Sequence, residues 1–519
     1  GFSDEHTRLT KHLNGNLKQV GNCPGNMVTK HVVKGRCQLF ELYLKENPLA
    51  MNYFKDKLGF YQKSRLNKEA YVKDIMKYSS IIEVGLVDSA TFERATNAVI
   101  SLLLSLGFAD RHYVTDGKSI RQSLNMNAAV GALYSGKKKD YFEEFTDDMF
   151  EQIVEDSCFR LFSGKLGVWN GSLKAELRSM EKVQANKTRS FTAAPLDTLL
   201  GGKVCVDDFN NTFYETCLKG PWTVGISKFY GGWNEFLNEL PEGWIYCDAD
   251  GSQFDSSLTP YLINAVLEIR TQCMERWTIG ERMLENLYTE IVYTPIATPD
   301  GSVIKKFKGN NSGQPSTVVD NTLMVMLAME YSKLKDSNKL NEEWIKYFAN
   351  GDDLIIAIHP KKEEFLDSLA AHFTSLGLKY DFSSRTRNKT DLWFMSHRGI
   401  KYDQVFIPKL EIERVVSILE WDRSTEPEHR LEALCAAMIE AWGYPELLYQ
   451  IRLFYKWVLE QAPFSEIAKI GKAPYIAETA LKHLYLGGEV QASELERYTA
   501  LLTDYFDDSE IETNVVEHQ

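Results

Sequence analysis

The stretch WIKYFANGDDLIIAI, residues 344–358, is an apolar, β-prone run interrupted by an Asn-Gly pair and two adjacent aspartates. Asn-Gly between two such runs is the strongest short-range hairpin signal. Both central residues of a type I′ turn need a positive φ, and these two residues adopt it at low cost. The sequence therefore predicts a β-hairpin with Asn350 and Gly351 in the turn and with Asp352 and Asp353 at its tip.

Two adjacent carboxylates at a hairpin tip favour a divalent-metal site. Carboxylates about 4 Å apart repel each other by roughly 4 kcal/mol at an effective dielectric constant near 20. A fold that fixes such a pair usually places a cation between its members. A solvated turn is the alternative, because a Gly-Asp-Asp triplet occurs by chance in about one chain of this length in ten. The triplet alone does not distinguish the two.

Composition sets the class of protein. The 519 residues allow a large core and about two or three domains. A net charge of −13 argues against nonspecific coating of nucleic acid, although it permits a basic channel inside an acidic surface. The longest apolar run, residues 98–109, is too short to span a bilayer, so membrane association would come through a partner. The eight scattered cysteines predict reduced thiols in a cytosolic or nuclear setting.

A second group of acidic residues follows a predicted strand in the middle of the chain. Residues 243–247, GWIYC, have the pattern of a buried strand, and the acidic segment DADGSQFD, residues 248–255, comes directly after it. Thr259 as N-cap and Pro260 at the first helical position then predict a helix through about Trp277. This order of strand, acidic loop and helix commonly presents metal ligands at the edge of a sheet.

The segment GNNSGQPSTVVDN, residues 309–321, is a polar loop that leads into another predicted helix. Thr317 and Asn321 are four residues apart and share a helical face. An N-cap and a surface polar pair would explain them without any function. Residues 361–376 predict a further helix and residues 378–382 a short strand. Together these elements predict an α+β fold with a small antiparallel sheet backed by helices.

The most basic window of this acidic chain carries five cations within sixteen residues, from Lys174 to Arg189. Lys187 and Arg189 are separated by one residue, so both point to the same side of an extended segment, which suits a triphosphate. A charged helix with i,i+4 ion pairs is the alternative, and Glu176 and Glu181 partly support it.

Two further segments differ in composition from the rest. The lysine triplet 137–139 is either a solvated surface, a contact for backbone phosphates or part of a nuclear signal. From about Glu411 onward the pattern is almost entirely helical, which predicts a separate helical subdomain with helices near 411–421, 427–442, 445–461 and 492–506. Residues 504–517 hold six acids and no Lys or Arg, and we expect this tail to be exposed and mobile.

The chain resembles the RNA-dependent RNA polymerases of positive-strand RNA viruses in the order and spacing of three motifs. These motifs are Asp250-x4-Asp255, Ser312-Gly313 with Thr317 and Asn321, and Gly351-Asp352-Asp353. More narrowly, residues 248–258 and 309–317 resemble the potyvirus polymerases, the nuclear inclusion b proteins. That similarity begins near Val28 and extends to the C-terminus.

The resemblance implies a right-hand polymerase with fingers, palm and thumb. The implied division is residues 1–242 as fingers with an N-terminal extension, 243–275 as palm, 276–312 as fingers, 313–408 as palm, and 409–519 as thumb and acidic C-terminal tail. Residues 515–519 resemble a site at which a potyvirus protease cuts a polyprotein, and Gly1 would follow such a cut. The chain is therefore expected to be a whole mature polyprotein product.

The resemblance also implies two-metal nucleotidyl transfer. Asp250 and Asp352 would bind Mg²⁺, with Mn²⁺ as an alternative ion, and Asp353 would support them. The ribose 2′-OH, which distinguishes RNA precursors from DNA precursors, would be read by Asp255, Thr317 and Asn321. The remaining residues implied to bind nucleotide are Ser312 and Gly313 in a mobile loop, and Lys174, Arg178, Lys187 and Arg189 in the nucleotide channel.

Contacts with RNA and the proton donor complete the implied site. The residues implied to contact RNA are Lys137, Lys138, Lys139, Trp393, His397 and Arg398. The general acid for pyrophosphate is expected just after the strand at Leu378, where Lys379, Arg385 and Lys389 are the candidates. Because the pKa of arginine exceeds about 12, Arg385 is a poor proton donor. Lys389 is the favoured candidate.

The implied function is RNA-templated RNA synthesis for viral replication and transcription. The implied partners are template and product RNA, nucleoside triphosphates, the viral genome-linked protein as a primer, its protease precursor, and host factors. The implied location is cytoplasmic replication complexes and the nucleus of the host cell. A reverse transcriptase is one alternative, against which Thr317 and Asn321 beside Asp255 argue. A noncatalytic RNA-binding recruitment scaffold is another, which the acidic tail and the lysine triplet permit.

Overall fold

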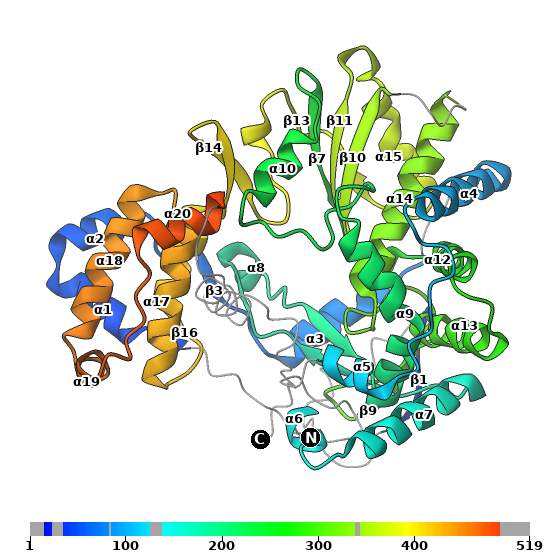
Figure 1. Cartoon of the computed structure of the whole chain (residues 1–519), viewed down its shortest axis with the longest axis horizontal. Coiled ribbons are helices and arrows are strands. Elements are labelled where there is room, and N and C mark those ends of the chain that lie inside the picture. The colour runs from blue at the N-terminus through cyan, green and yellow to red at the C-terminus, as the bar shows by residue number, and fades with distance from the viewer. Residues whose placement is uncertain (1–14, 23–34, 82–84, 125–137, 338–342, 488–519) are drawn as a thin grey trace.

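The computed structural model describes residues 15–22, 35–81, 85–124, 138–337 and 343–487. These residues form a helical body, on the left in Figure 1, and a larger body of sheets and helices. The lysine at position 137, the start of the family resemblance near Val28, the predicted helix 492–506 and the acidic tail lie outside the described residues.

A small antiparallel sheet at the centre of the larger body confirms the predicted architecture. Its strand order is β10-β11-β7-β12, and β13 also pairs with β7. The strands are β7 (Ile245–Gly251), β10 (Ile345–Asn350), β11 (Asp353–Ile358), β12 (Tyr380–Asp381) and β13 (Arg385–Thr386). The predicted strand 378–382 is thus shorter than expected, and the predicted hairpin at 344–358 is present.

Both faces of this central sheet are buried, which explains the continuous apolar run in β11. On one face Leu354 and Ile356 join a large core with the helices α12 (Pro260–Cys273), α14 (Thr317–Ser337) and α15 (Phe365–Ser375). On the other face Ile355 and Ala357 join a second core with Phe236 of α10 (Gly232–Asn238). Figure 1 shows α14 and α15 on one side of the sheet and α10 on the other.

A second, longer sheet lies beside the central one. Its order is β1-β9-β8-β4-β6, and β4 and β8 are its parallel pair. The strands are β1 (Leu17–Asn22), β4 (Trp169–Leu173), β6 (Ser190–Ala193), β8 (Pro295–Ala297) and β9 (Ser302–Lys306). Four more helices share the large core: α4 (Ser89–Ser105), α7 (Asp147–Ser163), α9 (Leu196–Glu215) and α13 (Thr278–Val292). The shorter helices of this body are α3 (Lys68–Ile75), α5 (Gly117–Ser123), α6 (Lys138–Phe142), α8 (Met180–Gln184) and α11 (Phe254–Ser257).

The helical body confirms the predicted change of pattern near residue 411. It contains α16 (Ile412–Glu420), α17 (Pro427–Ala441), α18 (Pro445–Leu459), α19 (Phe464–Lys469) and α20 (Glu478–Leu486), of which the last two were not predicted. A hairpin of β14 (Arg398–Tyr402) and β15 (Val405–Lys409) precedes these helices along the chain.

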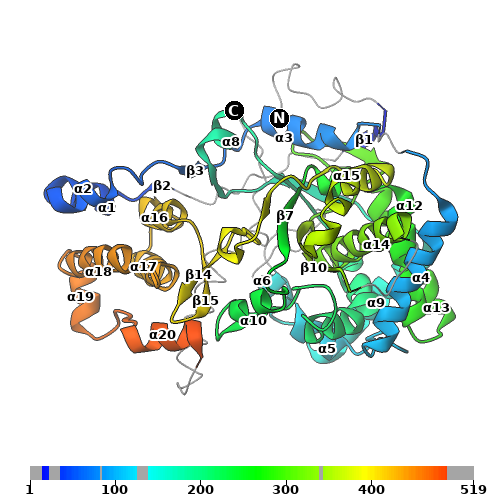
Figure 2. The ribbon, with the colours of Figure 1, turned by 90° about the horizontal axis from the view of Figure 1, so that it is seen from above.

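An N-terminal segment completes the core of the helical body. The helices α1 (Gln38–Glu46) and α2 (Pro48–Phe54) pack there, and the ring centroids of Phe40 and Phe454 are 5.0 Å apart. The short strand β2 (Gly35–Arg36) pairs with β16 (Trp421–Asp422), while β3 (Tyr61–Lys63) pairs with β5 (Leu177–Ser179) in the larger body. Figures 1 and 2 both show α1 and α2 beside α18. The first 242 residues therefore contribute to both bodies.

Two further observations concern the cysteines and the possibility of a membrane-spanning helix. Seven of the cysteines lie in the described part of the chain, and all seven are free thiols. Among the described helices, none has both the length and the apolar character needed to cross a membrane.

Candidate active site

The turn between β10 and β11 consists of Gly351 and Asp352, because Asn350 pairs with Asp353 across the hairpin. Gly351 has a φ of 58°, and its two neighbours do not have positive φ values. The prediction that Asn350 and Gly351 are the two central residues is thus wrong by one position. A glycine first and an ordinary residue second is the arrangement of a type II′ turn. Both aspartates still lie at the tip, as predicted.

Neighbouring segments hold the turn in this register. Asn350 stays in the strand because its side-chain amide donates to Oγ1 of Thr223 over 3.1 Å. The backbone N–H of Gly351 donates to Oγ1 of Thr322 in α14 over 2.8 Å. Thr223 belongs to a segment that pairs with the edge strand β10, and Thr322 belongs to α14, so the hairpin tip has a fixed position relative to both.

The register of the central sheet brings the predicted carboxylates together. The β7–β11 register ends at Leu354 opposite Ala249. Asp353 precedes Leu354 and Asp250 follows Ala249, so continuing the register by one residue would place Asp353 opposite Asp250. Residues that face each other directly in an antiparallel pair have Cβ atoms about 4.5–5.5 Å apart. Asp352 adjoins Asp353 along the chain. Asp250, Asp352 and Asp353 therefore form one acidic group, as the sequence predicts.

Asp248 has a structural contact of its own, although its charge also contributes to the raised pKa of Asp250, after burial. Its carboxylate oxygen Oδ2 accepts a hydrogen bond of 3.0 Å from the backbone N–H of Trp393. The acid two residues before Asp250 thus anchors a loop. This finding agrees with the spacing to Asp255, which selects Asp250 instead.

Burial and mutual repulsion change the acidity of the three carboxylates. Burial, and then the charge of Asp255, raises the pKa of Asp352 to about 6, while Arg189 acts in the opposite direction. Burial, and then the charges of Asp352 and Asp250, raises the pKa of Asp353 to about 7. Burial is also the main cause of the raised pKa of Asp250. A nearby cation would stabilise the charged form of all three.

This donor set fits a hard divalent cation. Carboxylate oxygens are the ligands that Mg²⁺ prefers, and Mg²⁺ is typically held by one or two carboxylates together with substrate phosphates. In the described part of the chain, no group of three or more metal-ligating side chains is already arranged around one point. Asp250, Asp352 and Asp353 nevertheless lie at neighbouring strand ends, and their raised pKa values indicate that their negative charges are compensated only in part.

The predicted ribose-reading residues are brought together only in part. Asn321 in α14 donates from Nδ2 to Oδ1 of Asp255 over 2.8 Å. Asp255 lies in α11, and burial raises its pKa. Thr317 instead donates to the backbone oxygen of Asn311 over 2.8 Å, at the start of its own helix. Asp255 and Asn321 thus form the predicted pair, and Thr317 closes the loop before it.

The Ser312-Gly313 loop is fixed to the edge of the longer sheet. Ser312 Oγ accepts from the backbone N–H of Thr192 over 3.2 Å, and the N–H of Gly313 donates to the oxygen of Thr192 over 3.0 Å. A Cβ atom on Gly313 would lie 2.5 Å from that same oxygen. Only glycine allows this close approach. The loop therefore joins α14 to strand β6, which begins one residue after Arg189.

The basic window contains the short strand β5 and the five-residue helix α8 rather than one long helix. Lys187 and Arg189 are exposed on either side of the buried Thr188, so they share one side of an extended segment, as predicted. Arg189 forms a two-point ion pair with Glu176, with 2.6 Å between Nε and Oε1. The alternative prediction of a charged helix is correct only for the five residues of α8, which include Glu181.

The other two predicted cations lie in the same cluster. Arg178 donates to the backbone oxygen of Lys187 and lies 3.7 Å from Glu176. The amine of Lys174 lies 5.5 Å from the ring centroid of Phe191. All four predicted cations therefore line one surface next to β6.

The structure does not bring Lys389 to the carboxylates. Its amine pairs with Glu242 over 2.6 Å, and its side chain is only 4% exposed. Thr386 pairs with Tyr246 in β7, four residues before Asp250, which corresponds to roughly 13 Å at about 3.3 Å per residue. The chain runs back along β7 after β12, so positions late in this segment move away from the hairpin tip.

The two other candidates for the general acid differ in position. Arg385 pairs with Asp367 of α15 over 2.6 Å. Lys379 is exposed, and its backbone oxygen accepts from Ser252 over 2.9 Å, next to the end of β7. Among the three candidates for the general acid, Lys379 is therefore the one that lies at the same end of β7 as Asp250.

The residues predicted to contact RNA have mixed surroundings. Trp393 is 41% exposed, and the guanidinium of Arg398 lies 5.6 Å from its ring centroid. His397 contacts Lys228 over 2.8 Å, and burial and this lysine lower the pKa of His397 to about 3. Lys228 in turn pairs with Glu440 of the helical body over 2.7 Å. Lys228 therefore connects His397 to the helical body.

The lysine triplet is only partly described. Lys138 is 7% exposed and Lys139 is exposed, at the start of α6. The alternative in which all three lysines are solvated is therefore wrong, because Lys138 is buried.

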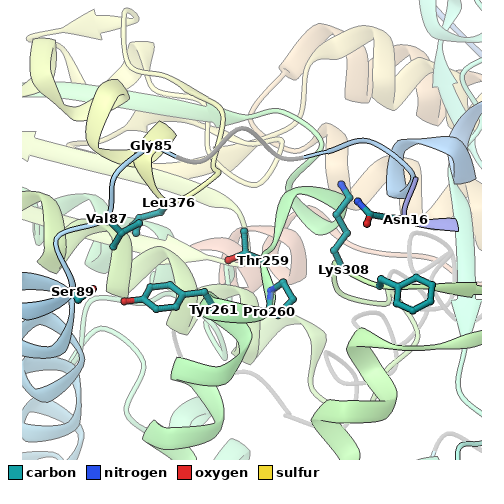
Figure 3. Close-up of a pocket in the computed structure, with 10 residues that line it drawn as sticks. Asn16, Gly85, Val87, Ser89, Thr259, Pro260, Tyr261, Lys308 and Leu376 are labelled. Carbon is teal, nitrogen blue, oxygen red and sulfur yellow. The ribbon is translucent and has the colours of Figure 1, made fainter. Parts of the chain in front are cut away.

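A cavity of about 530 Å³ lies beside the start of α12 (Figure 3). Tyr261 and Pro260 at the start of α12 form one part of its wall, and Phe307, Lys308 and Leu376 form other parts. The amine of Lys308 donates to the backbone oxygen of Ser256 over 2.7 Å. The cavity thus borders the segment that carries Asp255.

A buried polar network around Arg270 was not predicted. Arg270 is fully buried and contacts Asp320 over 2.8 Å, and the hydroxyl of Tyr288 donates to the same carboxylate over 2.9 Å. Gln314 and Asn310 extend this network toward Asn321. Arg270 lies four residues after Val266 and three before Cys273, and a charged residue at this spacing on the apolar face of α12 is the signal in the sequence that could have indicated it.

Comparisons with known proteins agree with this geometry. The family model for viral RNA-dependent RNA polymerases matches residues 42–459. The chain is 65% identical over 513 residues, 98% of its length, to the genome polyprotein of plum pox potyvirus (isolate NAT). It is 64% identical over 500 residues, 96% of its length, to that of bean yellow mosaic virus. It is 63% identical over 505 residues, 97% of its length, to that of turnip mosaic virus (strain Japanese).

The matched region is a small part of these relatives, because the chain spans 16% of the length of each of the three polyproteins. The family match nevertheless covers most of the chain and includes every residue of the acidic group, the Asp255–Asn321 pair and the Ser312-Gly313 loop. The chain therefore belongs to the viral RNA-dependent RNA polymerases, in their potyvirus form, a family whose members synthesise RNA on an RNA template.

Proposed function

We propose that this chain extends RNA by two-metal nucleotidyl transfer, with Asp250 and Asp352 as the ligands of two Mg²⁺ ions and Asp353 as their support. The observation that carries the proposal is the register of β7 against β11, whose continuation by one residue beyond Leu354 and Ala249 brings Asp353 beside Asp250 at the hairpin tip. When bound, such ions activate the 3′ hydroxyl of the RNA and stabilise the leaving pyrophosphate. Mn²⁺ has the same ligand preference and would be an alternative.

The other residues of the site would bind and orient the nucleotide. Asp255 and Asn321 would receive the ribose 2′-OH, since both are hydrogen-bonding groups within 2.8 Å of each other. Arg189 would neutralise the triphosphate, which its effect on the pKa of Asp352 supports. Lys379 is the better candidate for the proton donor to pyrophosphate, because it adjoins β12 at the carboxylate end of β7.

The parts of a right hand correspond to the observed bodies. We assign the central sheet with α12, α14 and α15 to the palm, the longer sheet with its helices to the fingers, and the helical body to the thumb. The exposed Trp393 and the half-buried Arg398 lie in the segment that leads from the central sheet to the helical body, which suits a role in holding the primer.

Priming, partners and location follow from the resemblance to potyvirus polymerases. Template and product RNA and nucleoside triphosphates are the substrates that the family implies. A tyrosine of the viral genome-linked protein would serve as primer, and its protease precursor and host factors would be partners. Membrane association would come through partners, and the chain would work in cytoplasmic replication complexes and in the nucleus. Relatives that are genome polyproteins support release by a protease.

Primer extension on a poly(A) template with Mg²⁺ tests the metal assignment. Asp352→Ala should abolish UTP incorporation while RNA binding persists. Asp403→Asn is the matched control, because Asp403 lies at the exposed tip of the β14–β15 hairpin with a φ of 46°, which asparagine also tolerates. Elongation by Asp352→Ala at the parent rate would refute the catalytic assignment and favour the scaffold alternative. Incorporation of dTTP as efficient as that of UTP would favour a reverse transcriptase.

A further inference from the structure

A chain of side-chain amides leads from the buried Asp320 to the ribose-reading pair. Gln314 Nε2 donates to Asp320 Oδ2 over 2.8 Å and to Asn310 Oδ1 over 3.1 Å. Asn310 Nδ2 donates to Asn321 Oδ1 over 2.9 Å, and Asn321 Nδ2 donates to Asp255 Oδ1 over 2.8 Å. We call Gln314, Asn310 and Asn321 the amide relay. It contains one residue, Asn321, that the family motifs include as a ribose reader, and two residues that they do not.

The direction of the amide relay is fixed at both ends. An ionised carboxylate accepts hydrogen bonds and donates none, so an amide that contacts one must present its nitrogen. Asp320 therefore orients Gln314, and Asp255 orients Asn321. Between them, Asn310 accepts on one side and donates on the other. A reversed Asn310 amide would place oxygen against oxygen at Asn321 and nitrogen against nitrogen at Gln314.

The far end of the relay is anchored rigidly. Arg270 is fully buried and contacts Asp320 Oδ1 through two nitrogens, at 3.1 and 2.8 Å. The hydroxyl of Tyr288 donates to the same carboxylate over 2.9 Å. Charge-assisted hydrogen bonds of this kind are the strong ones in proteins. Asp320 therefore cannot turn away from Gln314 without leaving a buried charge unpaired.

The backbone of Asn310 is fastened to the same place. Its N–H donates to the backbone oxygen of Asp255 over 2.8 Å, and its carbonyl oxygen accepts from the hydroxyl of Tyr78 over 2.9 Å. The side chain is 1% exposed. Asn310 is thus hydrogen-bonded both to the segment that carries Asp255 and to the side chain of Asn321, so it sets the distance between them.

We propose that Asn310, held by Gln314 and Asp320, is a positioning residue for ribose selection. Asn310 donates to the side-chain oxygen of Asn321 and so keeps the side-chain nitrogen of Asn321 directed at Asp255. One carboxylate oxygen of Asp255 is then engaged by Asn321, and the other is left to accept the 2′-OH of the incoming nucleotide. The inference rests on the proposed ribose-reading role of Asp255 and Asn321 and goes beyond it to the residues that orient them.

The test compares kcat/KM for UTP and dUTP on a poly(A) template with an oligo(U) primer. Asn310→Ala should lower the ratio of UTP to dUTP efficiency by about tenfold, with the loss confined to UTP, because dUTP has no 2′-OH to use the contact. Asn310→Asp should lower the ratio further, because an acceptor at this position draws the Asn321 nitrogen away from Asp255. The double variant Asn310→Ala/Asn321→Ala should match Asn321→Ala alone, since Asn310 acts through Asn321.

Asn311→Ala is the matched control. Asn311 is the next residue, is equally buried at 1% exposure, and donates to Oγ1 of Thr294 over 2.8 Å, outside the relay. It should lower the melting temperature by a similar amount and leave the UTP to dUTP ratio unchanged.

Each outcome separates this inference from the proposed function. If Asn321→Ala lowers the ratio and Asn310→Ala does not, the relay inference fails while ribose reading stands. If neither Asn321→Ala nor Asp255→Asn changes the ratio, the ribose-reading role itself fails. Equal loss of UTP and dUTP incorporation in Asn310→Ala would reveal a merely structural role and overturn the inference. Should Asn310→Ala not fold, Asn310→Asp, which keeps the shape of the side chain, decides by the same ratio.

Discussion

The hydroxyl of Tyr380 donates a hydrogen bond of 2.5 Å to the backbone oxygen of Asp352. This contact ties the short strand β12 to the hairpin tip, across the end of β7. The ring of Tyr380 also stacks on Phe382, with 5.8 Å between centroids. Tyr380 therefore stabilises the hairpin tip that carries Asp352 and Asp353, in addition to the pairing of the strands.

Tyr380→Phe should loosen the tip without removing the packing of the ring. The variant loses one hydrogen bond, which corresponds to about 1 kcal/mol of unfolding free energy. Because the lost contact orients the turn, we expect a severalfold higher Mg²⁺ concentration for half-maximal primer extension, with a smaller change in the maximal rate. A Mg²⁺ titration measures both. An unchanged Mg²⁺ dependence would mean that strand pairing alone positions Asp352.

Two glycines of the site should respond differently to alanine. Gly351 has a φ of 58° and no atom within 4 Å of a built Cβ, so Gly351→Ala costs only the left-handed backbone conformation, about 1 kcal/mol. A Cβ on Gly313 would lie 2.5 Å from the backbone oxygen of Thr192, so Gly313→Ala must push the loop away from β6. Thermal denaturation should show a small shift for the first variant. The rate of primer extension should fall more for Gly313→Ala than for Gly351→Ala. Equal losses of activity in the two variants would contradict the close contact between Gly313 and β6.

Features of the site that arise from neighbouring residues could be predicted from the sequence. Features that arise from contacts between residues far apart along the chain could not. The hairpin at residues 344–358 was predictable, because an Asn-Gly pair between apolar runs is a local signal. The position of the turn was missed by one residue, since Thr223 and Thr322 decide it and both are distant along the chain. Lys389 was misplaced for a similar reason, because β13 returns along β7.

Other features depend on burial, which the sequence does not display. The family resemblance implied that Asp255, Thr317 and Asn321 act together, whereas Asn310 and Gln314 look like ordinary loop residues until both are seen to be buried. The packing of α1 and α2 against α18 joins residues about 400 positions apart, and no local pattern predicts such a contact. The fold class and the position of the acidic residues at the hairpin tip were therefore accessible from sequence, and the residues that surround them were not.

Removal of metal should make stability depend on pH through the acidic group. The folded chain raises the pKa of Asp352 to about 6 and that of Asp353 to about 7, above the ordinary value of 3.8. For a carboxyl whose pKa is raised by folding, the stabilising contribution is present below pH 4 and is lost as the pH rises through 7. A tenfold change in an acid dissociation constant corresponds to about 1.4 kcal/mol, so the loss of stability is on the order of a few kcal/mol.

The measurement compares urea unfolding of the parent with that of Asp353→Asn in EDTA between pH 5 and pH 8. The neutral asparagine should make the variant increasingly more stable than the parent as the pH rises, because it removes the repulsion with Asp352 and Asp250. Added Mg²⁺ should stabilise the parent and reduce this difference. A difference that does not vary with pH would show that these carboxylates are not strained in the metal-free chain.

Glu176 should control nucleotide binding through Arg189. The Glu176 side chain is 6% exposed and forms a two-point ion pair with Arg189, whose own side chain is 54% exposed. Glu176→Gln weakens this pair, so the guanidinium can adopt other orientations on the surface of the proposed nucleotide channel. We expect the KM for UTP to rise about tenfold with a smaller change in kcat, because binding rather than chemistry loses an interaction. Glu181→Gln, an exposed residue of α8 in the same basic window, is the control and should leave the KM unchanged. If both variants raise the KM equally, the effect comes from the overall charge of the window and the orientation of Arg189 has no part in it.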